Sequence, residues 1–442
     1  MVTQSSSTVL QHLHQRLLQA RANTDSLFRI VRENNLYERP IPERHRIVFY
    51  VGHLEAFDWN LFRDHLFTKK FTATPFDQLF AFGIDPVDGG LPADRPSDWP
   101  SLEEVRGYVG TLRNRIDDAL SAGDFDGSEK RGDALAETLL NVAVEHRLMH
   151  AETLAYMFHQ LPYERKIAQS QSQLAAVCTV NGLIDVPEGK TTLGFARQGD
   201  SRFGWDNEFE AHTVHVPGFR INRYMVTNAE YLRFVGDGGY QNARHWSAED
   251  WQWKEANEIG HPAFWRRTGP SWNYRGMFEE FPLPTNWPVY VSHAEASAYA
   301  RWAKQALPTE AQWHRAAYSS RKEAERDYPW GSAPPEAARG NFDFARWDPS
   351  PVNAYSDNNS DFGVNGLLGN GWEWTSTPFA PFAGFRAFPF YEGYSANFFD
   401  NKHYVIKGGS ARTAACLLRR SFRNWFQPHY QYVYAGFRCV SE

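Results

Sequence analysis

The sequence has few cysteines and no long apolar run. Three of its 442 residues are cysteine, Cys178, Cys416 and Cys439, and none of them forms a pair with metal-binding spacing. A disulfide framework is therefore not expected, and unpaired thiols favour a reducing cytoplasm. No stretch approaches the roughly eighteen apolar residues of a membrane span, so membrane insertion is not expected. The N-terminus lacks an apolar segment behind a basic one, which argues against a signal peptide.

A surplus of positive charge is also missing. The chain has 46 lysines and arginines against 52 aspartates and glutamates, for a formal net charge of -6. Nucleic acids and anionic membranes are bound mainly through basic patches, so we expect neither as a partner. A small-molecule substrate is the better expectation. Aromatic residues, by contrast, make up 15% of the chain, so aromatic binding surfaces are expected as well as aromatic cores.

The chain is long enough for two or three domains, and its composition changes near residue 166. Residues 1–165 have the apolar periodicity of long amphipathic helices, which predicts a bundle that can hold a metal between facing helices. Residues 166–185 are expected to form a linker. From there to 442, tryptophan, glycine, proline and asparagine predict short strands and long loops. The helices are expected at residues 9–32, 47–62, 101–123 and 133–161. The third is expected to begin with a capping box of Ser101 and Glu104 and to end at Gly123.

Three histidines in the helical part form a candidate metal site. His146 and His150 are four residues apart, so both project from one face of a helix. His53 lies in another predicted helix, where Gly52 permits close approach of a neighbour. Glu152 is better placed to hydrogen-bond a ligand than to act as one. Spacing alone leaves open a hydrogen-bonded core histidine, and it does not choose iron over zinc.

Two sets of motifs resemble a known family. The segment HRLMHAE (146–152), with GHLEAFDW (52–59), resembles the H-x3-H-x-E signature of the DinB-type bundle in the sulfoxide synthases of ergothioneine biosynthesis. The second half resembles the fold of formylglycine-generating enzymes that accompanies this bundle. The resemblance implies an α+β chain: a DinB-like four-helix bundle (1–165), then a formylglycine-generating-enzyme-like, C-type-lectin-like domain (186–442). Its landmarks are VPEGKTTLG (186–194), PVYVSHAEASAYARWA (288–303), LPTEAQWHRAA (307–317), YPWG (328–331), GNGWEWT (369–375), GGS (408–410) and AGFRC (435–439).

The resemblance also implies a cofactor. Family members bind iron(II) through three histidines, which His53, His146 and His150 match. Formylglycine-generating enzymes themselves hold copper with a pair of cysteines. Because GGSARTAAC supplies Cys416 without a second cysteine, copper is not expected here.

Family members act on hercynine, the trimethylated betaine of histidine, together with dioxygen. RNWF (423–426) resembles the family's substrate motif, in which Asn424 hydrogen-bonds the substrate and Trp425 contacts the trimethylammonium group. In FRAFPFYEGYSANFF (385–399), Tyr391 and Tyr394 match two active-site tyrosines, the first of which is the catalytic proton donor. If the segment is aligned on its Phe-Pro pair instead, Phe390 occupies the position of the proton donor. A core position is the alternative interpretation of Trp425.

Two positions depart from the family pattern. Met149 stands where many members have a glutamine that binds the imidazole. Phe426 stands where users of gamma-glutamylcysteine have an aspartate for the ammonium group of the donor. The resemblance is closest to the selenoneine synthases, which use a selenosugar. Cysteine or gamma-glutamylcysteine as donor, a zinc or nickel thiol transferase, and a non-catalytic carbohydrate-binding module are the alternatives.

Overall fold

The computed structural model describes residues 6–81, 93–123, 129–171, 174, 181–197, 202–322 and 324–442. The chain divides into two compact units, Met1–Gln169 and Ser170–Glu442. This division falls within the stretch 166–185 that the sequence suggests as a linker. Cys178 lies outside the described residues. Among the described helices, none has both the length and the apolar character needed to cross a bilayer.

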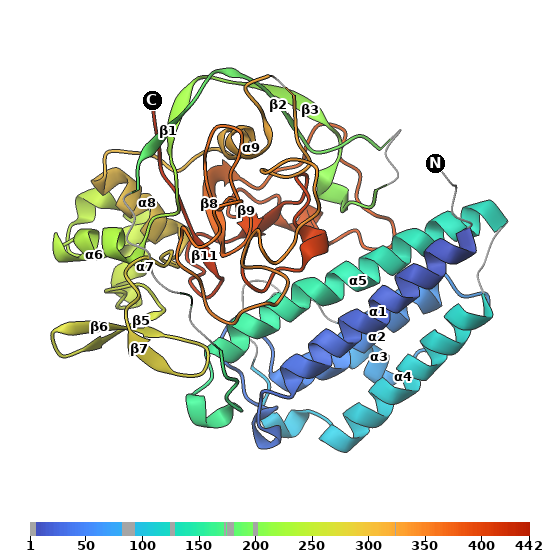
Figure 1. The fold of residues 1–442 in the computed structure, drawn as a ribbon. Coiled ribbons are helices and arrows are strands. Elements are labelled where there is room, and N and C mark those ends of the chain that lie inside the picture. The colour runs from blue at the N-terminus through green and yellow to red at the C-terminus, as the bar shows by residue number, and fades with distance from the viewer. Residues whose placement is uncertain are drawn as a thin grey trace. The chain divides into compact units, whose positions relative to one another are not determined.

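The N-terminal unit is a helical bundle, as the sequence predicts (Figure 1). A short helix that the apolar periodicity does not predict, α3 (Pro75–Leu79), lies between the second and third long helices. The long helices in the described ranges are α1 (Ser6–Phe28), α2 (Ile47–His65), α4 (Leu102–Ala122) and α5 (Glu129–His159).

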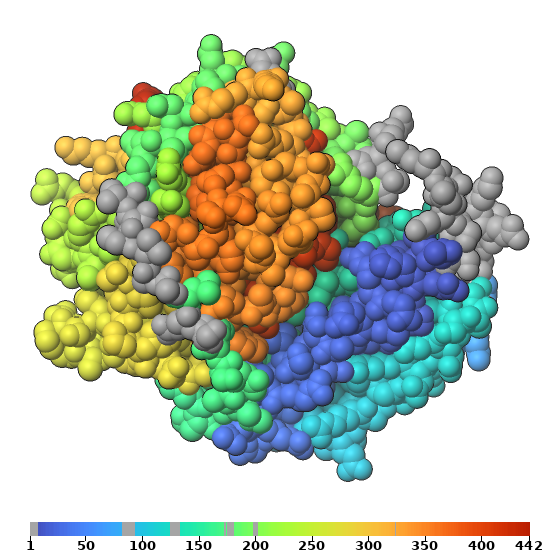
Figure 2. All heavy atoms as spheres, in the orientation of Figure 1, coloured from blue at the N-terminus to red at the C-terminus, as the bar shows by residue number. Residues whose placement is uncertain are grey.

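The long helices of the bundle pack against one another in sequence-distant pairs. Helix α1 runs along α5, and α2 contacts both α4 and α5. An ion pair between Arg21 and Asp117, at 2.7 Å, joins α1 to α4, whose side chains lie next to one another in dark blue and cyan in Figure 2. The centre is apolar and is filled from all four helices by fully buried side chains, among them Leu17, Phe62, Ile116 and Leu139. Burial of these apolar side chains stabilises the bundle.

The ends of α4 follow from its sequence. The hydroxyl of Ser101 accepts the N–H of Glu104, and the Glu104 carboxylate accepts the N–H of Ser101 in return. Gly123 ends the helix in the left-handed conformation, with φ 68°, which glycine adopts without strain. This capping box and this end were both expected from the sequence.

The C-terminal unit has mixed α and β structure, which confirms the expected α+β class. Its four-stranded sheet has the order β10-β9-β8-β11, in which β11 runs parallel to β8. Smaller sheets have the orders β1-β4-β12, β5-β6-β7 and β2-β3. The strands are β1 (Leu183–Val186), β2 (Gly189–Leu193), β3 (His212–Val216), β4 (Phe219–Asn222), β5 (Trp265–Thr268), β6 (Ser271–Arg275), β7 (Glu280–Pro282), β8 (Gly371–Pro378), β9 (Tyr404–Gly409), β10 (Asn424–Phe426), β11 (Ala435–Gly436) and β12 (Val440–Ser441).

The helices of this unit are short and capped. Ser292 and Glu295 form a capping box at the start of α8, and Thr309 and Gln312 form another at the start of α9. Two of the sequence landmarks, the segments 288–303 and 307–317, therefore contain the residues that cap and begin these two helices. The helices are α6 (Asn228–Gly236), α7 (Ala248–Ala256), α8 (His293–Trp302) and α9 (Glu310–Tyr318).

A buried ion pair connects three sequence landmarks that lie far apart along the chain. Glu373 on β8 accepts hydrogen bonds from Arg438, at 2.6 Å, and from the indole of Trp313 on α9, at 2.8 Å. All three side chains are fully buried. Removal of any one leaves a buried polar group without its partner, which is far more costly than loss of a surface contact.

Candidate functional site

The three histidines expected to bind a metal meet inside the bundle. His53 comes from α2, and His146 and His150 come from successive turns of α5. Their ligand atoms all lie within 4.8 Å of one another, and Nε2 of His146 lies 3.1 Å from Nε2 of His150. Two imidazole nitrogens that share one metal, each at about 2.1 Å, lie at roughly this separation. The cluster therefore has the size of a mononuclear metal site.

The ring of His53 is oriented by the short helix α3. Nδ1 of His53 lies 2.7 Å from the main-chain carbonyl of Phe80, the residue that follows α3. Because a carbonyl can only accept, Nδ1 carries the proton, and Nε2 keeps a lone pair for a metal. A Cβ on Gly52 would lie 2.6 Å from the Phe80 ring. The absence of a side chain at Gly52 thus allows the approach that orients His53.

Aromatic rings pack against the ligand rings. Phe49 stacks on His53 with ring centroids 4.8 Å apart, and Phe57 stacks on His146 at 3.5 Å. Phe49 and Phe57 lie one helical turn before and after His53, so α2 supplies both. This packing restricts the rotamers of the ligands before any metal binds, which is what a preorganised site requires.

The electrostatic surroundings keep the three histidines neutral. Burial lowers the pKa of His53 to about 4, and the positive charges of His45 and Arg147 act in the same direction. Burial likewise holds the pKa of His146 and His150 well below the ordinary value. Neutral imidazole is the form that binds a metal, so the site does not have to lose protons at neutral pH.

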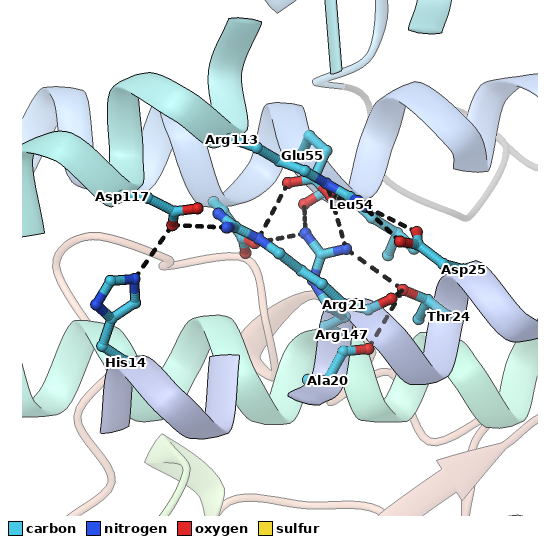
Figure 3. A network of polar contacts seen from close by, with 11 residues as sticks. His14, Ala20, Arg21, Thr24, Asp25, Leu54, Glu55, Arg113, Asp117 and Arg147 are labelled. Carbon is cyan, nitrogen blue, oxygen red and sulfur yellow. Dashed lines mark hydrogen bonds and ion pairs between the residues drawn. The ribbon is translucent and has the colours of Figure 1, made fainter. Parts of the chain in front are cut away.

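An ion network that the sequence analysis did not anticipate lies beside the triad. Figure 3 shows Arg21, Arg113 and Arg147 converging on Glu55, with closest distances of 3.5, 2.7 and 3.0 Å. Arg147 also donates to Asp58 at 2.6 Å. These residues come from all four long helices. Arg147 directly follows His146, and Glu55 lies two residues after His53, so the network ties together the two helices that carry the ligands.

Glu152 and Met149 lie on α5 close to the ligands in sequence. Glu152 is buried, with 6% of its surface exposed, and Met149 is half-buried. Their expected contacts, with a metal ligand and with substrate, remain predictions.

A second group of expected site residues lies in the C-terminal unit. Strand β10 consists of Asn424, Trp425 and Phe426, all half-buried, and pairs antiparallel with β9. Trp425 is stacked on Phe379, with centroids 4.0 Å apart and planes 7° apart. The rings of Tyr394 and Trp425 form a T-shaped pair, with centroids 5.5 Å apart and planes 76° apart. One face of Trp425 is thus occupied by protein.

The two candidate tyrosines lie in the loop before β9. Tyr391 and Tyr394 have ring centroids 5.5 Å apart, and Tyr394 joins the aromatic group around Trp425. Phe390, the alternative to Tyr391, stacks on Phe388 at 4.9 Å. Phe426 stacks on Tyr430 at 5.3 Å, with planes 9° apart. The functional roles of these residues remain predictions.

Buried charges support the strand that carries Trp425. Arg423 forms an ion pair with Glu310 at 2.9 Å, and both are almost fully buried. The ammonium of Lys407 donates to the main-chain carbonyls of Arg420, at 3.1 Å, and Phe422, at 2.5 Å. Burial lowers the pKa of Lys407 to about 8. Periodicity of apolar residues gives no signal for such buried charges in loops, so the sequence did not reveal them.

The fold and the triad define a class: a helical bundle with a buried three-histidine site, joined to a domain of the formylglycine-generating type. Residues 16–154 match the profile of the DinB superfamily, and residues 168–442 match that of the sulfatase-modifying factor enzyme 1-like domain.

Three curated relatives are similar to this chain over most of its length. The hercynine oxygenase of Mycobacterium tuberculosis is 35% identical over 342 residues, which cover 77% of this chain and 78% of the relative. That of Mycolicibacterium thermoresistibile is 36% identical over 346 residues, covering 77% and 75%. Ergothioneine biosynthesis protein 1 of Neurospora crassa is 27% identical over 500 residues, covering 93% of this chain and 55% of that one. The chain belongs to the hercynine oxygenase family.

Proposed function

We propose that the protein is an oxygen-dependent, non-haem iron(II) enzyme that joins selenium from a selenosugar to C2 of the imidazole ring of hercynine. The observation that carries the proposal is the buried triad of His53, His146 and His150, in a chain 35% identical to a hercynine oxygenase. The net change removes a hydrogen from C2 and one from the chalcogen, and dioxygen accepts both with their electrons. The alternative is a sulfoxide synthase that joins the sulfur of cysteine or gamma-glutamylcysteine to C2. In that reaction dioxygen accepts the same two hydrogens and four electrons in all, so that one oxygen atom ends on sulfur and the other in water.

The triad fits a metal that must keep positions open. Three neutral imidazoles occupy one side of the site and leave other positions to small molecules. The hydrogen bond from His53 to Phe80 and the stacked phenylalanines hold the ligand rings in place. Iron(II) bound there would supply the redox chemistry that dioxygen requires. Glu152 is proposed to support a ligand through a hydrogen bond.

Trp425 and Asn424 are proposed to bind hercynine. A quaternary ammonium group cannot donate a hydrogen bond, so an aromatic face is its natural partner in proteins. Because Phe379 covers one face of Trp425, we assign the trimethylammonium group to the other face. The thioether of Met149 cannot donate a hydrogen bond, so recognition of the imidazole falls to another group or to water.

Tyr391 is proposed as the proton donor of the reaction. It is half-buried and lies next to Tyr394, which contacts Trp425 and would line the same pocket. Phe390 carries no transferable proton. If its position were the functional one, the proton would have to come from Tyr394 or from solvent.

The surroundings of Phe426 favour a donor without an ammonium group. Phe426 stacks on Tyr430 and pairs across the strands with Tyr404. An unpaired ammonium buried beside such rings costs several kcal/mol, on the order of the desolvation of a charge. A sugar bearing a selenolate avoids this cost, and its hydroxyls can hydrogen-bond loop side chains. A selenolate also stays ionised at neutral pH because selenols are more acidic than thiols.

The direct test is turnover by purified iron(II)-loaded protein with hercynine and air. A selenosugar, a thiosugar, cysteine and gamma-glutamylcysteine are supplied in separate reactions, and products are identified by mass spectrometry. We expect the selenosugar to give the highest kcat/KM, and Phe426→Asp to narrow the difference from cysteine. If cysteine is the better donor for the wild type, the selenium assignment fails and a sulfoxide synthase remains. Product formation by the zinc form without oxygen would instead identify a thiol transferase.

A further inference from the structure

A buried carboxylate holds the loop that carries the two candidate tyrosines. Asp206, at the start of the 3-10 helix η5 (Asp206–Glu208), is fully buried. The hydroxyl of Ser395, the residue after Tyr394, donates to Oδ1 of Asp206. The side-chain amide of Asn207 donates in turn to the Ser395 hydroxyl at 2.9 Å. Two consecutive residues of η5 therefore form hydrogen bonds with one end of the tyrosine loop, which we define as residues 388–395.

The other end of the tyrosine loop also faces Asp206. The main-chain N–H of Phe388 is close enough to lower the pKa of Asp206. Between these ends the loop makes two successive turns: the N–H of Tyr391 donates to the carbonyl of Phe388 at 3.0 Å, and that of Tyr394 donates to the carbonyl of Tyr391 at 3.2 Å. One carboxylate thus meets both ends of a segment only eight residues long, and both tyrosines lie between these ends.

The residue before Asp206 contacts the same loop through its ring. Trp205 is fully buried and stacks on Tyr394, with centroids 4.0 Å apart and planes 27° apart. Its ring is also 6.4 Å from that of Tyr391 and 6.3 Å from that of Phe388. The indole supports the inner side of the loop, while the neighbouring carboxylate fixes its ends.

The charged form of Asp206 is less favourable in the folded chain than the protonated form. Burial raises its pKa to about 6, and Oδ2 is buried without a hydrogen-bond partner. A raised pKa means that the folded chain binds this proton more tightly than the unfolded chain. The stability contribution is therefore present at acid pH and is lost as the pH rises through about 6. A buried group that lowers stability at neutral pH is typical of a functional position.

We propose that Asp206 is a positioning residue that, through its hydrogen bond with Ser395 and with the support of Trp205, holds Tyr391 and Tyr394 against the pocket beside Trp425. Tyr394 connects the two groups, because its ring stacks on Trp205 and forms a T-shaped pair with Trp425. This role rests on the proposed function, since that function makes the tyrosines and Trp425 parts of one pocket.

Four variants separate the hydrogen bond from the charge. Asp206→Ala and Ser395→Ala remove the hydrogen bond, whereas Asp206→Asn and Ser395→Thr keep an acceptor and a hydroxyl. Asp206→Ala and Asp206→Asn both remove the negative charge, but only Asp206→Asn keeps an oxygen that can accept the hydrogen bond from Ser395. Ser356→Ala is the matched control, because Ser356 donates to Asp357 on the exposed surface of the same unit.

Two readouts are needed. The first is amide hydrogen exchange of the tyrosine loop by mass spectrometry, which does not depend on activity. We expect the two alanine variants at positions 206 and 395 to raise the exchange rate by about threefold or more, and the conservative variants to leave it near the wild-type value. The second is turnover with hercynine and the best donor. We expect kcat to fall by roughly tenfold in those alanine variants, with hercynine affinity nearly unchanged, because the tyrosines are misplaced while Trp425 remains.

The melting temperature distinguishes a positioning role of Asp206 from a contribution to the stability of the fold. At pH 8 the melting temperature of Asp206→Asn should equal or exceed that of the wild type, while its kcat is retained. Unchanged exchange in Asp206→Ala overturns the proposal, as does raised exchange with full kcat. An Asp206→Asn variant as impaired as Asp206→Ala overturns it too, since the charge would then be the requirement. If the wild type does not turn over hercynine, the proposed function fails, and the exchange measurement still decides whether Asp206 holds the loop.

Discussion

The carbonyl of Phe80 accepts the Nδ1 proton of His53 at 2.7 Å, and the ring of the same phenylalanine fills the space that a side chain on Gly52 would need. One residue after a five-residue helix thus determines which nitrogen of His53 faces a metal. The two contacts depend on each other, because the carbonyl and the ring belong to one residue.

We expect Gly52→Ala to weaken metal binding. The new methyl group would lie 2.6 Å from the Phe80 ring, so Phe80 has to shift, and we expect this shift to weaken the hydrogen bond between its carbonyl and His53. Loss of such a supporting hydrogen bond typically weakens metal affinity by about ten- to a hundredfold. The measurement is an anaerobic iron(II) titration. Gly110→Ala on α4 is the control, because its Cβ would meet no atom within 4 Å. Equal affinity in both variants would contradict the role of Phe80.

The ion network predicts a large loss of stability in Arg147→Met. This change leaves Glu55 and Asp58 buried with one guanidinium fewer, which typically costs about 3–5 kcal/mol. Arg106→Met, which breaks an exposed pair with Glu33, should cost far less, because solvent-exposed ion pairs contribute little to stability. Denaturant unfolding of both variants measures the difference. Similar small losses would show that the network is not needed for the bundle.

The apolar periodicity of the sequence predicts the four long helices, and the histidine motifs lead to the expectation that three histidines meet. Ser101 and Glu104 fixed the start of α4 because a capping box is a local pattern, and the spacing of His146 and His150 placed both on one face of a helix. The roles of α3 and of Trp205 were not predictable in this way. Phe80 and Trp205 act through contacts with residues far along the chain, and such contacts leave no periodic pattern.

Trp425→Ala should weaken binding of hercynine much more than binding of histidine. Only hercynine carries the quaternary cation, and a desolvated cation over an aromatic face is worth about 2 kcal/mol, or roughly a thirtyfold change in affinity. Binding of both ligands to the iron(II) protein can be measured by calorimetry without oxygen. Trp330→Ala, which changes a tryptophan stacked on Tyr328, serves as the control. Equal losses for the two ligands would mean that Trp425 only packs against Phe379.

The buried His293 predicts a loss of stability in mild acid. Burial lowers its pKa to about 4, so between pH 6.5 and 4 the unfolded chain binds a proton that the folded chain does not. Stability from this residue is therefore present above its unfolded pKa and is lost as the pH falls. The ring stacks on Tyr404 at 3.8 Å, and His293→Phe should keep this packing while removing the titration. Unfolding at pH 7 and pH 5 should show a smaller acid loss in the variant than in the wild type, and equal losses would refute the assignment.

The central claim is that His53, His146 and His150 together hold one iron(II) with positions open to small molecules. Nitric oxide added anaerobically to the iron(II) protein reports on this directly, since it binds an open position and gives the electron paramagnetic resonance spectrum of a high-spin iron nitrosyl. We predict this spectrum for the wild type, a changed line shape when hercynine and the donor are added, and no specific signal in His150→Ala. The control His12→Ala, an exposed histidine on α1, should match the wild type. An unaltered spectrum in His150→Ala, or no nitrosyl signal in the iron-loaded wild type, would contradict the account.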